Sequence, residues 1–175
     1  MLSACWDASG TLLGSDYRLF KDTPSWELAR AVKREDTPAI RSIASGNKML
    51  IDYQEPVYGK TLLMLAVTNH DYLSATALLN VGADPNKHDS YDGASSMIKA
   101  AAIVNDQGDN TRFLKLLLSH GGNPNDEETG PRQEGNTTRM TPLLAACFDL
   151  IDFGSPIEKV KLLVKTGADV NHKNE

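Results

Sequence analysis

Residues 59–86 read GKTLLMLAVTNHDYLSATALLNVGADPN, and this stretch decides the fold because its parts recur along the chain. Its first half opens on Thr61, whose side chain can accept a hydrogen bond from the free N–H groups of a first helical turn. After a polar break at residues 69–71, apolar residues return at the spacing that one face of a second helix gives. Gly82 can then take the left-handed conformation that ends a helix. The stretch therefore predicts a helix, a turn, a second helix and a second turn.

Parts of this pattern occur again in other segments. The turn at residues 82–86 has counterparts at 121–125 and 167–171, with a weaker relative at Gly46 and Asn47, and the helix start at residues 61–66 has counterparts at 95–100 and 141–146. This arrangement resembles the ankyrin repeat, which has a period of about 33 residues and a Thr-Pro-Leu-His-x-Ala helix start. The resemblance spans roughly residues 23–171. It implies an all-α ankyrin-repeat solenoid of about four helix-turn-helix repeats, with extended turns and an N-terminal cap.

The domain organisation follows from this resemblance. We expect residues 1–21 to form an N-terminal tether and cap, in which the segment from Tyr17 to Phe20 docks on the first repeat. Residues 22–175 would form the ankyrin-repeat domain, with repeats at about 22–58, 59–91, 92–139 and 140–175. In the first repeat an Asp-Thr-Pro sequence precedes each of two helices, which we expect at residues 25–32 and 39–44. Asp or Thr can cap a helix, and proline suits its first position.

One spacing between repeats departs from the ordinary value. Ala66 and Ala100 are 34 residues apart, whereas Ala100 and Ala146 are 46 residues apart. About five residues of this excess lie between the paired helices of the third repeat, and the rest lies in a polar segment at residues 126–139. The fourth repeat also carries about five extra residues between its helices. Insertions in a repeat domain collect on its faces and are often where partners bind.

The composition argues against several classes of function. A net charge of −5 with no run of basic residues argues against a nucleic-acid groove, which needs clustered Lys and Arg. No apolar run approaches the roughly 18 residues of a membrane span. The two cysteines and four histidines have neither disulfide-framework nor metal-ligand spacing. No nucleophile, base or phosphate-binding glycine loop can be assigned either. We therefore expect no enzyme activity, no cofactor and no metal.

The N-terminus carries a second resemblance. Residues 2–5, Leu-Ser-Ala-Cys, resemble the lipobox at the end of a bacterial lipoprotein signal peptide, in which the cysteine becomes the lipidated first residue. This implies a periplasmic protein whose membrane attachment is a lipid on Cys5. The charged and apolar regions of a signal peptide are missing, so either they lie upstream or Met1 starts a cytoplasmic form. The alternative is that Cys5 is an ordinary terminal residue.

Three groups of polar and aromatic residues in the expected turns are candidate protein-binding residues. They are Tyr53, Gln54, Glu55 and Tyr58 in the first turn, His88, Asp89, Tyr91 and Asp92 in the second, and Glu127, Glu128, Arg132, Glu134 and Arg139 in the third. Tyrosine is favoured at interfaces because it presents a large rigid surface with a hydrogen-bonding end. For the tyrosines of the first turn, the alternative is packing along the base of the turn. For the charged residues of the third turn, it is simple solvation.

The two resemblances together imply a specific function. Ankyrin repeats bind proteins, and a lipid-anchored ankyrin module in a bacterial envelope resembles the immunity proteins that neutralise secreted antibacterial effectors. We expect the partner to be a cognate effector toxin, such as a type VI secretion phospholipase, whose active-site entrance the turns would occlude. The alternative is a periplasmic scaffold or regulator without a toxin partner, and an enzyme is a distant third class.

Overall fold

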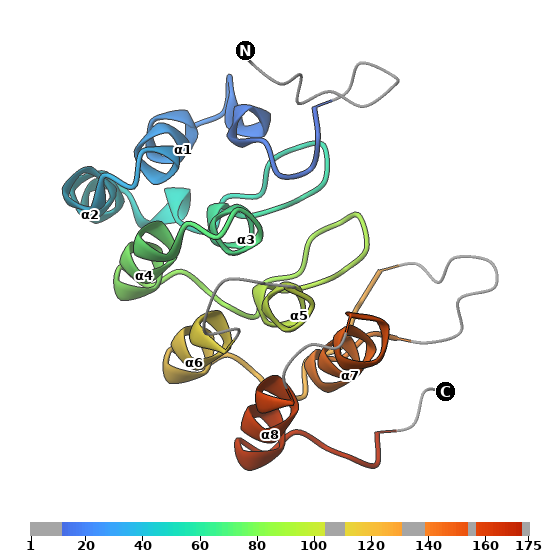
Figure 1. The fold of residues 1–175 in the computed structure, drawn as a ribbon. Coiled ribbons are helices and arrows are strands. Elements are labelled where there is room, and N and C mark those ends of the chain that lie inside the picture. The colour runs from blue at the N-terminus through green and yellow to red at the C-terminus, as the bar shows by residue number, and fades with distance from the viewer. Residues whose placement is uncertain (1–11, 104–110, 131–138, 154–156, 173–175) are drawn as a thin grey trace. The chain divides into compact units, whose positions relative to one another are not determined.

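The computed structural model describes residues 12–103, 111–130, 139–153 and 157–172, and Figure 1 shows its fold. Within these ranges it contains eight α-helices, two short 3-10 helices and no strand. In chain order they are η1 (Tyr17–Phe20), α1 (Trp26–Lys33), α2 (Thr37–Gly46), η2 (Lys48–Leu50), α3 (Leu62–Thr68), α4 (Tyr72–Asn80), α5 (Ser96–Ala101), α6 (Arg112–Ser119), α7 (Pro142–Phe153) and α8 (Glu158–Lys165). The fold is therefore all-α, as the repeat pattern predicts.

The helices form four pairs, and each pair falls within one of the four expected repeats. The chain divides into two compact units, an N-terminal unit, Met1–Ala83, and a C-terminal unit, Asp84–Glu175. Each unit holds two helix pairs, and within each unit the second pair packs on the first. This is the helix-turn-helix arrangement of an ankyrin-repeat solenoid, so the predicted fold class is confirmed.

In the N-terminal unit, α3 and α4 pack on α1 and α2, and η1 packs on α1. Helix α3 packs against α1 and α4, and every residue from Leu62 to Val67 is buried. Its burial on all sides explains why this helix is apolar throughout. The 3-10 helix η1 contributes Tyr17, Leu19 and Phe20 to the buried core. The segment expected to form the N-terminal cap therefore lies against the first helix pair.

Buried hydrogen bonds join distant parts of this unit. The Tyr17 hydroxyl donates to Asp71 Oδ2 at 2.6 Å, and the Ser74 hydroxyl donates to the carbonyl of Val32 at 2.6 Å. Burial, and next the hydrogen bond to Asp71, raises the pKa of Tyr17. The phenol therefore stays protonated and keeps its donor role at neutral pH.

The residues predicted to cap helix α3 and to end three of the helices have these roles in the structure. The Thr61 hydroxyl accepts a hydrogen bond from the N–H of Met64 at 3.3 Å, which caps α3. Gly82, Gly121 and Gly167 have φ values of 100°, 84° and 98°, so each ends its helix in the left-handed conformation. Gly46, the weaker relative, instead lies at the end of α2 and has no positive φ.

Only the second of the two Asp-Thr-Pro sequences starts a helix. Asp36 caps α2 by accepting from the N–H of Ala39 at 3.1 Å. The helix expected at residues 25–32 is present one residue later, as α1, but the capping role expected for residues 22–24 is wrong, because Asp22 has a φ of 63° and Ser25 precedes the helix. The Thr23 hydroxyl instead donates back to the carbonyl of Phe20 at 2.7 Å, which closes the turn after η1.

In the C-terminal unit, α5 packs on α6 and α7, and α7 packs on α8. Two asparagine bridges, each formed by one side-chain amide, join its successive helix-ending turns. In each bridge the amide donates to a glycine carbonyl at 2.9 Å and accepts from the N–H two residues further on, at 2.7 and 2.6 Å. The bridges join Asn86 to Gly121 and Asn123, and Asn125 to Gly167 and Asp169. They satisfy backbone groups that the helices leave unpaired.

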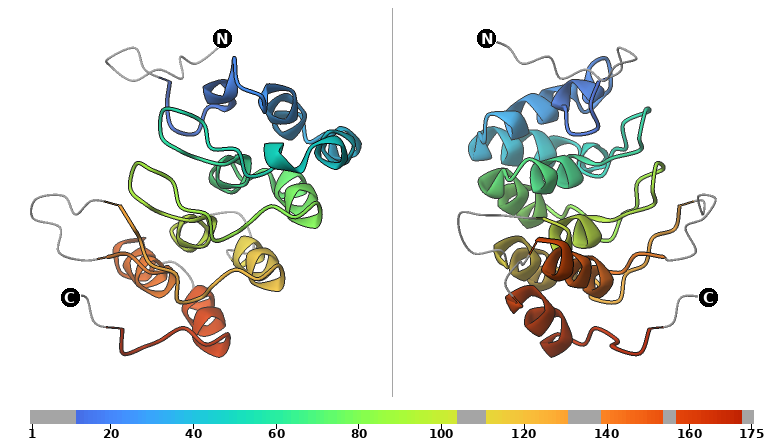
Figure 2. Two further views of the ribbon diagram at one scale, coloured as in Figure 1. Left: turned by 180° about the vertical axis from the view of Figure 1, so that it is seen from behind. Right: turned by 45° about the vertical axis from the view of Figure 1, so that its right-hand side comes forward.

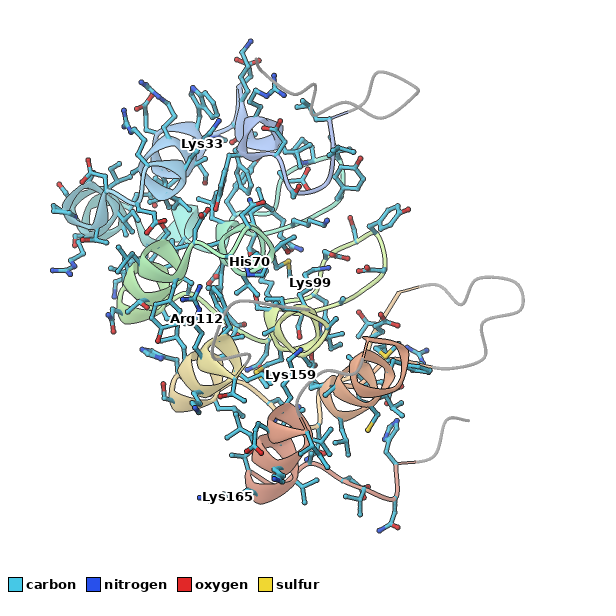
Figure 3. The ribbon with its side chains drawn as sticks, viewed as in Figure 1. Lys33, His70, Lys99, Arg112, Lys159 and Lys165 are labelled. Carbon is cyan, nitrogen blue, oxygen red and sulfur yellow. The ribbon has the colours of Figure 1, made fainter. Side chains whose placement is uncertain are left out.

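A buried lysine performs a similar task at the end of α5. Lys159, in the first turn of α8, is 1% exposed. Its ammonium donates to the carbonyl of Ala101 at 3.0 Å and to the carbonyl of Ile103, and Figure 3 shows it between the two helices. The last carbonyls of a helix lack partners within the helix and attract a positive charge. Lys159 therefore ties α8 to the end of α5.

We predict that Lys159→Met destabilises the protein by about 2 kcal/mol, because it leaves buried carbonyls without their donor. The measurement is equilibrium unfolding in urea. The matched control is Lys161→Met, since Lys161 lies on the same helix with its side chain 61% exposed. Its replacement should change stability by less than about 0.5 kcal/mol. Equal effects of the two substitutions would contradict the role assigned to Lys159.

Candidate functional site

The first turn with predicted binding residues lies in the N-terminal unit and is organised by Glu55. This side chain belongs to a residue that is only 1% exposed. Its carboxylate accepts hydrogen bonds from the backbone N–H groups of Val57, Tyr58 and Lys60 at 2.7 to 3.0 Å. In this structure Glu55 supports the turn from a buried position, and its predicted contact with a partner stays a prediction.

The side chains of the other predicted residues in this turn also contact other residues of the same chain. The Tyr53 ring lies 6.4 Å from the ring of Phe20, and the Tyr58 hydroxyl donates to the carbonyl of Leu12 at 2.9 Å. Gln54 donates to the carbonyl of Gly59 at 2.6 Å. These contacts favour the packing alternative for the two tyrosines. The turn also exposes Val57, which is 53% exposed and which the sequence pattern did not single out.

The second turn is organised in the same way by Asp89 in the C-terminal unit. The Asp89 side chain is fully buried and lies 2.9 Å from the ammonium of Lys99. Its other oxygen accepts from the N–H groups of Tyr91, Asp92 and Gly93 at 3.0 to 3.2 Å. Burial acts to raise the pKa of Asp89, but the hydrogen bonds and the Lys99 charge outweigh it and hold the pKa below 3.8. Like Glu55, Asp89 supports its turn from a buried position, and its predicted contact with a partner stays a prediction.

What this turn presents to solvent is Tyr91 and Asp92. Tyr91 is 61% exposed, and the Asp92 side chain is 43% exposed and lies 3.5 Å from Lys99. The backbone beneath them is fixed by Asp89. An exposed aromatic ring on a rigid turn is the arrangement that interface anchors adopt.

The third turn lies directly against the second. The N–H of Thr129 donates to the carbonyl of Gly93 at 3.0 Å, and both turns project from the same side of their helices (Figure 2). Gly93 has a φ of 71°, and a Cβ atom there would lie 1.9 Å from the backbone nitrogen of Gly130. A side chain at this position would therefore separate the two turns.

The charged residues of the third turn pair mainly with one another. Glu127 lies 3.2 Å from Arg139 and 3.6 Å from His172, and His88 from the second turn lies 3.0 Å from Asp126. Arg139 also donates to the backbone carbonyl of Glu128 at 2.6 Å. Two predicted residues, Arg132 and Glu134, lie outside the described residues, as does Cys5.

The second and third turns both belong to the C-terminal unit. We define the tip surface as their described residues that reach solvent. It consists of Tyr91, Asp92, Glu127, Glu128 and Arg139. Sequence reasoning missed Lys99, which supports this surface from α5. It also missed the buried position of Asp89, although an aspartate at the start of a glycine-containing turn is a known signal for side-chain capping of backbone N–H groups.

The described residues show no group of three His, Cys, Asp or Glu side chains that could hold a metal ion. In the same part of the chain, no helix is both long enough and apolar enough to cross a membrane. The tip surface presents an aromatic ring and a set of charged side chains, which are groups suited to recognition of a partner.

The electrostatics of Glu128 lead to a pH-dependent prediction. Burial, and next the nearby Asp92 charge, raises the pKa of Glu128 above its usual 4.5, although the N–H of Met140 acts in the opposite direction. A carboxyl whose pKa is higher in the folded state contributes stability below pH 4.5, and this contribution is lost as the pH rises through the folded-state value. The folded protein thus holds the neutral form of Glu128 more strongly than the unfolded chain does.

We therefore predict that Glu128→Gln raises the melting temperature at pH 7 and leaves it unchanged near pH 4. Glutamine keeps the acceptor for Met140 and removes the charge that burial disfavours. Thermal unfolding at both pH values is the measurement. Glu127→Gln is the control, because it removes a carboxylate that pairs with Arg139, and it should bring no gain at pH 7. A gain for Glu128→Gln that is equal at both pH values would be inconsistent with the raised pKa.

Comparison with known proteins agrees with this architecture. A family model described as ankyrin repeats, in three copies, matches residues 63–174. The chain is also similar to Protein PhlB of Serratia liquefaciens, with 32% identity over 134 residues, or 77% of this chain and 52% of that protein. It thus spans about half the length of the curated relative that it matches. Ankyrin repeats are typically non-enzymatic and bind proteins. Since the family match covers more than half of the chain and the helix pairs agree with it, the chain belongs to the ankyrin-repeat family of protein-binding modules.

Proposed function

We propose that this protein is a bacterial immunity protein that binds a secreted antibacterial effector, such as a phospholipase, and occludes its active site. The observation that carries the proposal is the tip surface, where the buried Asp89, paired with Lys99, fixes the turn that exposes Tyr91. The similarity to a Serratia liquefaciens protein supports a bacterial setting.

The construction of the tip surface favours tight binding. Association costs free energy when loops must become ordered, and a turn that is already fixed by hydrogen bonds to Asp89 avoids much of that cost. An exposed tyrosine can then fill a pocket on the partner and act as an anchor. The carboxylates of Asp92 and Glu127 would favour a basic surface around that pocket and would accelerate the encounter.

Occlusion also requires no chemistry from the inhibitor. A rigid protrusion seated in the entrance of an active site excludes the substrate by volume alone. The lack of a metal-binding group among the described residues is compatible with this mode of action. The inhibitor would need only shape, charge and affinity.

The experiment that tests the proposal is co-expression with the product of the neighbouring gene, which the proposal expects to be a lipase-like toxin. We expect the two proteins to co-purify as a complex and the toxin to lose its lipase activity in that complex. The absence of a complex at micromolar concentrations would overturn the proposal. A complex with full toxin activity would favour the periplasmic scaffold or regulator instead.

Within such a complex, we predict that Tyr91→Ala weakens binding about 10-fold or more, because truncation of an aromatic anchor costs roughly 2 kcal/mol. Calorimetric titration would measure the dissociation constants. The matched control is Leu73→Ala, since Leu73 is 57% exposed on α4 and lies outside the turns. It should bind as tightly as the unchanged protein. An effect of Leu73→Ala as large as that of Tyr91→Ala would place the interface elsewhere.

We also propose that the protein reaches the periplasm as a lipoprotein anchored through Cys5. In the full-length protein with its native upstream sequence, Cys5→Ala should move the protein from the membrane fraction to the soluble fraction. Radiolabelled palmitate incorporation would report the lipid directly. If membrane association and labelling are the same for both forms, the anchor proposal fails, whereas effector binding can still hold.

A further inference from the structure

The second helices of the third and fourth repeats, α6 and α8, leave a groove between them. In the N-terminal unit the corresponding helices α2 and α4 pack on each other, whereas α6 and α8 make little contact. Figure 1 shows α6 and α8 on the side of the C-terminal unit away from the second and third turns. The groove has a volume of about 330 Å³ and is lined by Thr111, Lys115, Glu158, Lys161, Leu162 and Lys165. It is therefore separate from the tip surface.

The charge of this groove is opposite to that of the whole chain. The protein carries 18 basic and 23 acidic side chains, yet three of the four ionisable residues that line the groove are lysines. The two walls each contribute, since Lys115 belongs to α6 and Lys165 to α8. The carboxylate of Glu158 lies 2.8 Å from the ammonium of Lys161. Three lysines and one glutamate give the groove a net charge of +2.

We propose that the groove between α6 and α8 binds a small, soluble molecule that carries a phosphate monoester. Such a group has between about 1.5 and 2 negative charges at pH 7, which matches the net charge of the lining residues. Lysine ammonium groups bind phosphate as point charges and need no fixed geometry. Leu162 offers an apolar contact to the organic part of the ligand. Pockets of about 300 Å³ and more are large enough for small ligands.

The shape of the groove favours a soluble ligand over the phosphate groups of a lipid bilayer. Basic segments that bind an anionic bilayer typically cluster about four to eight Lys or Arg residues on one surface. Here three lysines flank a hollow between two helices. One phosphate group placed there can interact with both walls at once. Because α6 and α8 otherwise make little contact, such a ligand would join them and stabilise the C-terminal unit.

This inference does not depend on the effector partner. The groove and the tip surface share no residue, so either role can fail without the other.

The test is a titration of the full chain with phenyl phosphate, followed by calorimetry and by the NMR shifts of backbone amides. We expect a dissociation constant below about 1 mM, with the largest shifts in α6 and α8. Phenyl sulfate is the control ligand, because it has the same ring and a similar shape but a single negative charge. It should bind about fivefold more weakly or less, since attraction to the lysines scales with ligand charge.

Substitutions in the groove should change the affinity for phenyl phosphate in both directions. Lys115→Gln and Lys165→Gln should each weaken binding about fivefold or more, because each removes one positive charge. The matched control is Lys21→Gln, since Lys21 is exposed in the N-terminal unit, and it should leave the affinity unchanged. Glu158→Gln should tighten binding about threefold, because it removes the negative charge beside Lys161. A gain in affinity cannot result from a variant that fails to fold.

Three results would overturn the inference. One is the absence of heat and of shifts with phenyl phosphate at millimolar concentrations. Another is an equal loss of affinity in Lys21→Gln and Lys115→Gln, which would mean attraction to charge without a site. The third is binding to phosphatidylglycerol vesicles, but not to phosphatidylcholine vesicles, by a protein that does not bind phenyl phosphate. That result would assign the lysines to a membrane surface.

Discussion

The structure depends on one constraint, which is that every buried backbone N–H and C=O group needs a partner. Helices of six to twelve residues leave a large share of their polar groups outside the helical hydrogen-bond pattern. In this protein, side chains supply the missing partners. Glu55 and Asp89 accept the N–H groups of two turns, the asparagine bridges serve the helix-ending turns, and Lys159 serves the end of α5. Short helices and long turns are stable together because these side chains pair with the backbone groups, and Glu55, Asp89 and Lys159 do so from buried positions.

Because of this constraint, the residues that support a turn differ from the residues that the turn exposes to solvent. The charged groups that fix the turns are withdrawn from solvent, and the residues next to them in sequence are turned outward. Asp89 and Tyr91 are two positions apart, yet one is buried and the other is 61% exposed. A turn built in this way presents its aromatic ring without help from a partner. Preorganised surfaces of this kind bind well because little conformational freedom remains to be lost.

The fold could be predicted from the sequence because its signals are local. Thr61 and Asp36 cap helices, and Gly82, Gly121 and Gly167 end them, through interactions that reach only a few residues along the chain. The roles of the site residues could not be predicted as well, because burial depends on contacts between distant segments. Lysine and glutamate are ordinarily exposed, so nothing in the local pattern indicates that Lys159 and Glu55 lie inside. The capping role expected for residues 22–24 failed for a local reason, since the Thr23 hydroxyl donates to the carbonyl of Phe20 at the end of η1.

The contact between Gly93 and Gly130 limits how the tip surface can vary. Neither Gly93 nor Gly130 leaves room for a Cβ atom, because one at Gly130 would lie 2.3 Å from the carbonyl oxygen of Asp92. The side chains of Tyr91 and Asp92 reach solvent from the same turn, but Asp92 also accepts a hydrogen bond from the N–H of Ala94 at 3.1 Å. Residue 91 is therefore the position of this turn that can change without loss of a supporting contact from its side chain. A protein engineer could retarget the turn by randomising residue 91 and keeping the two glycines.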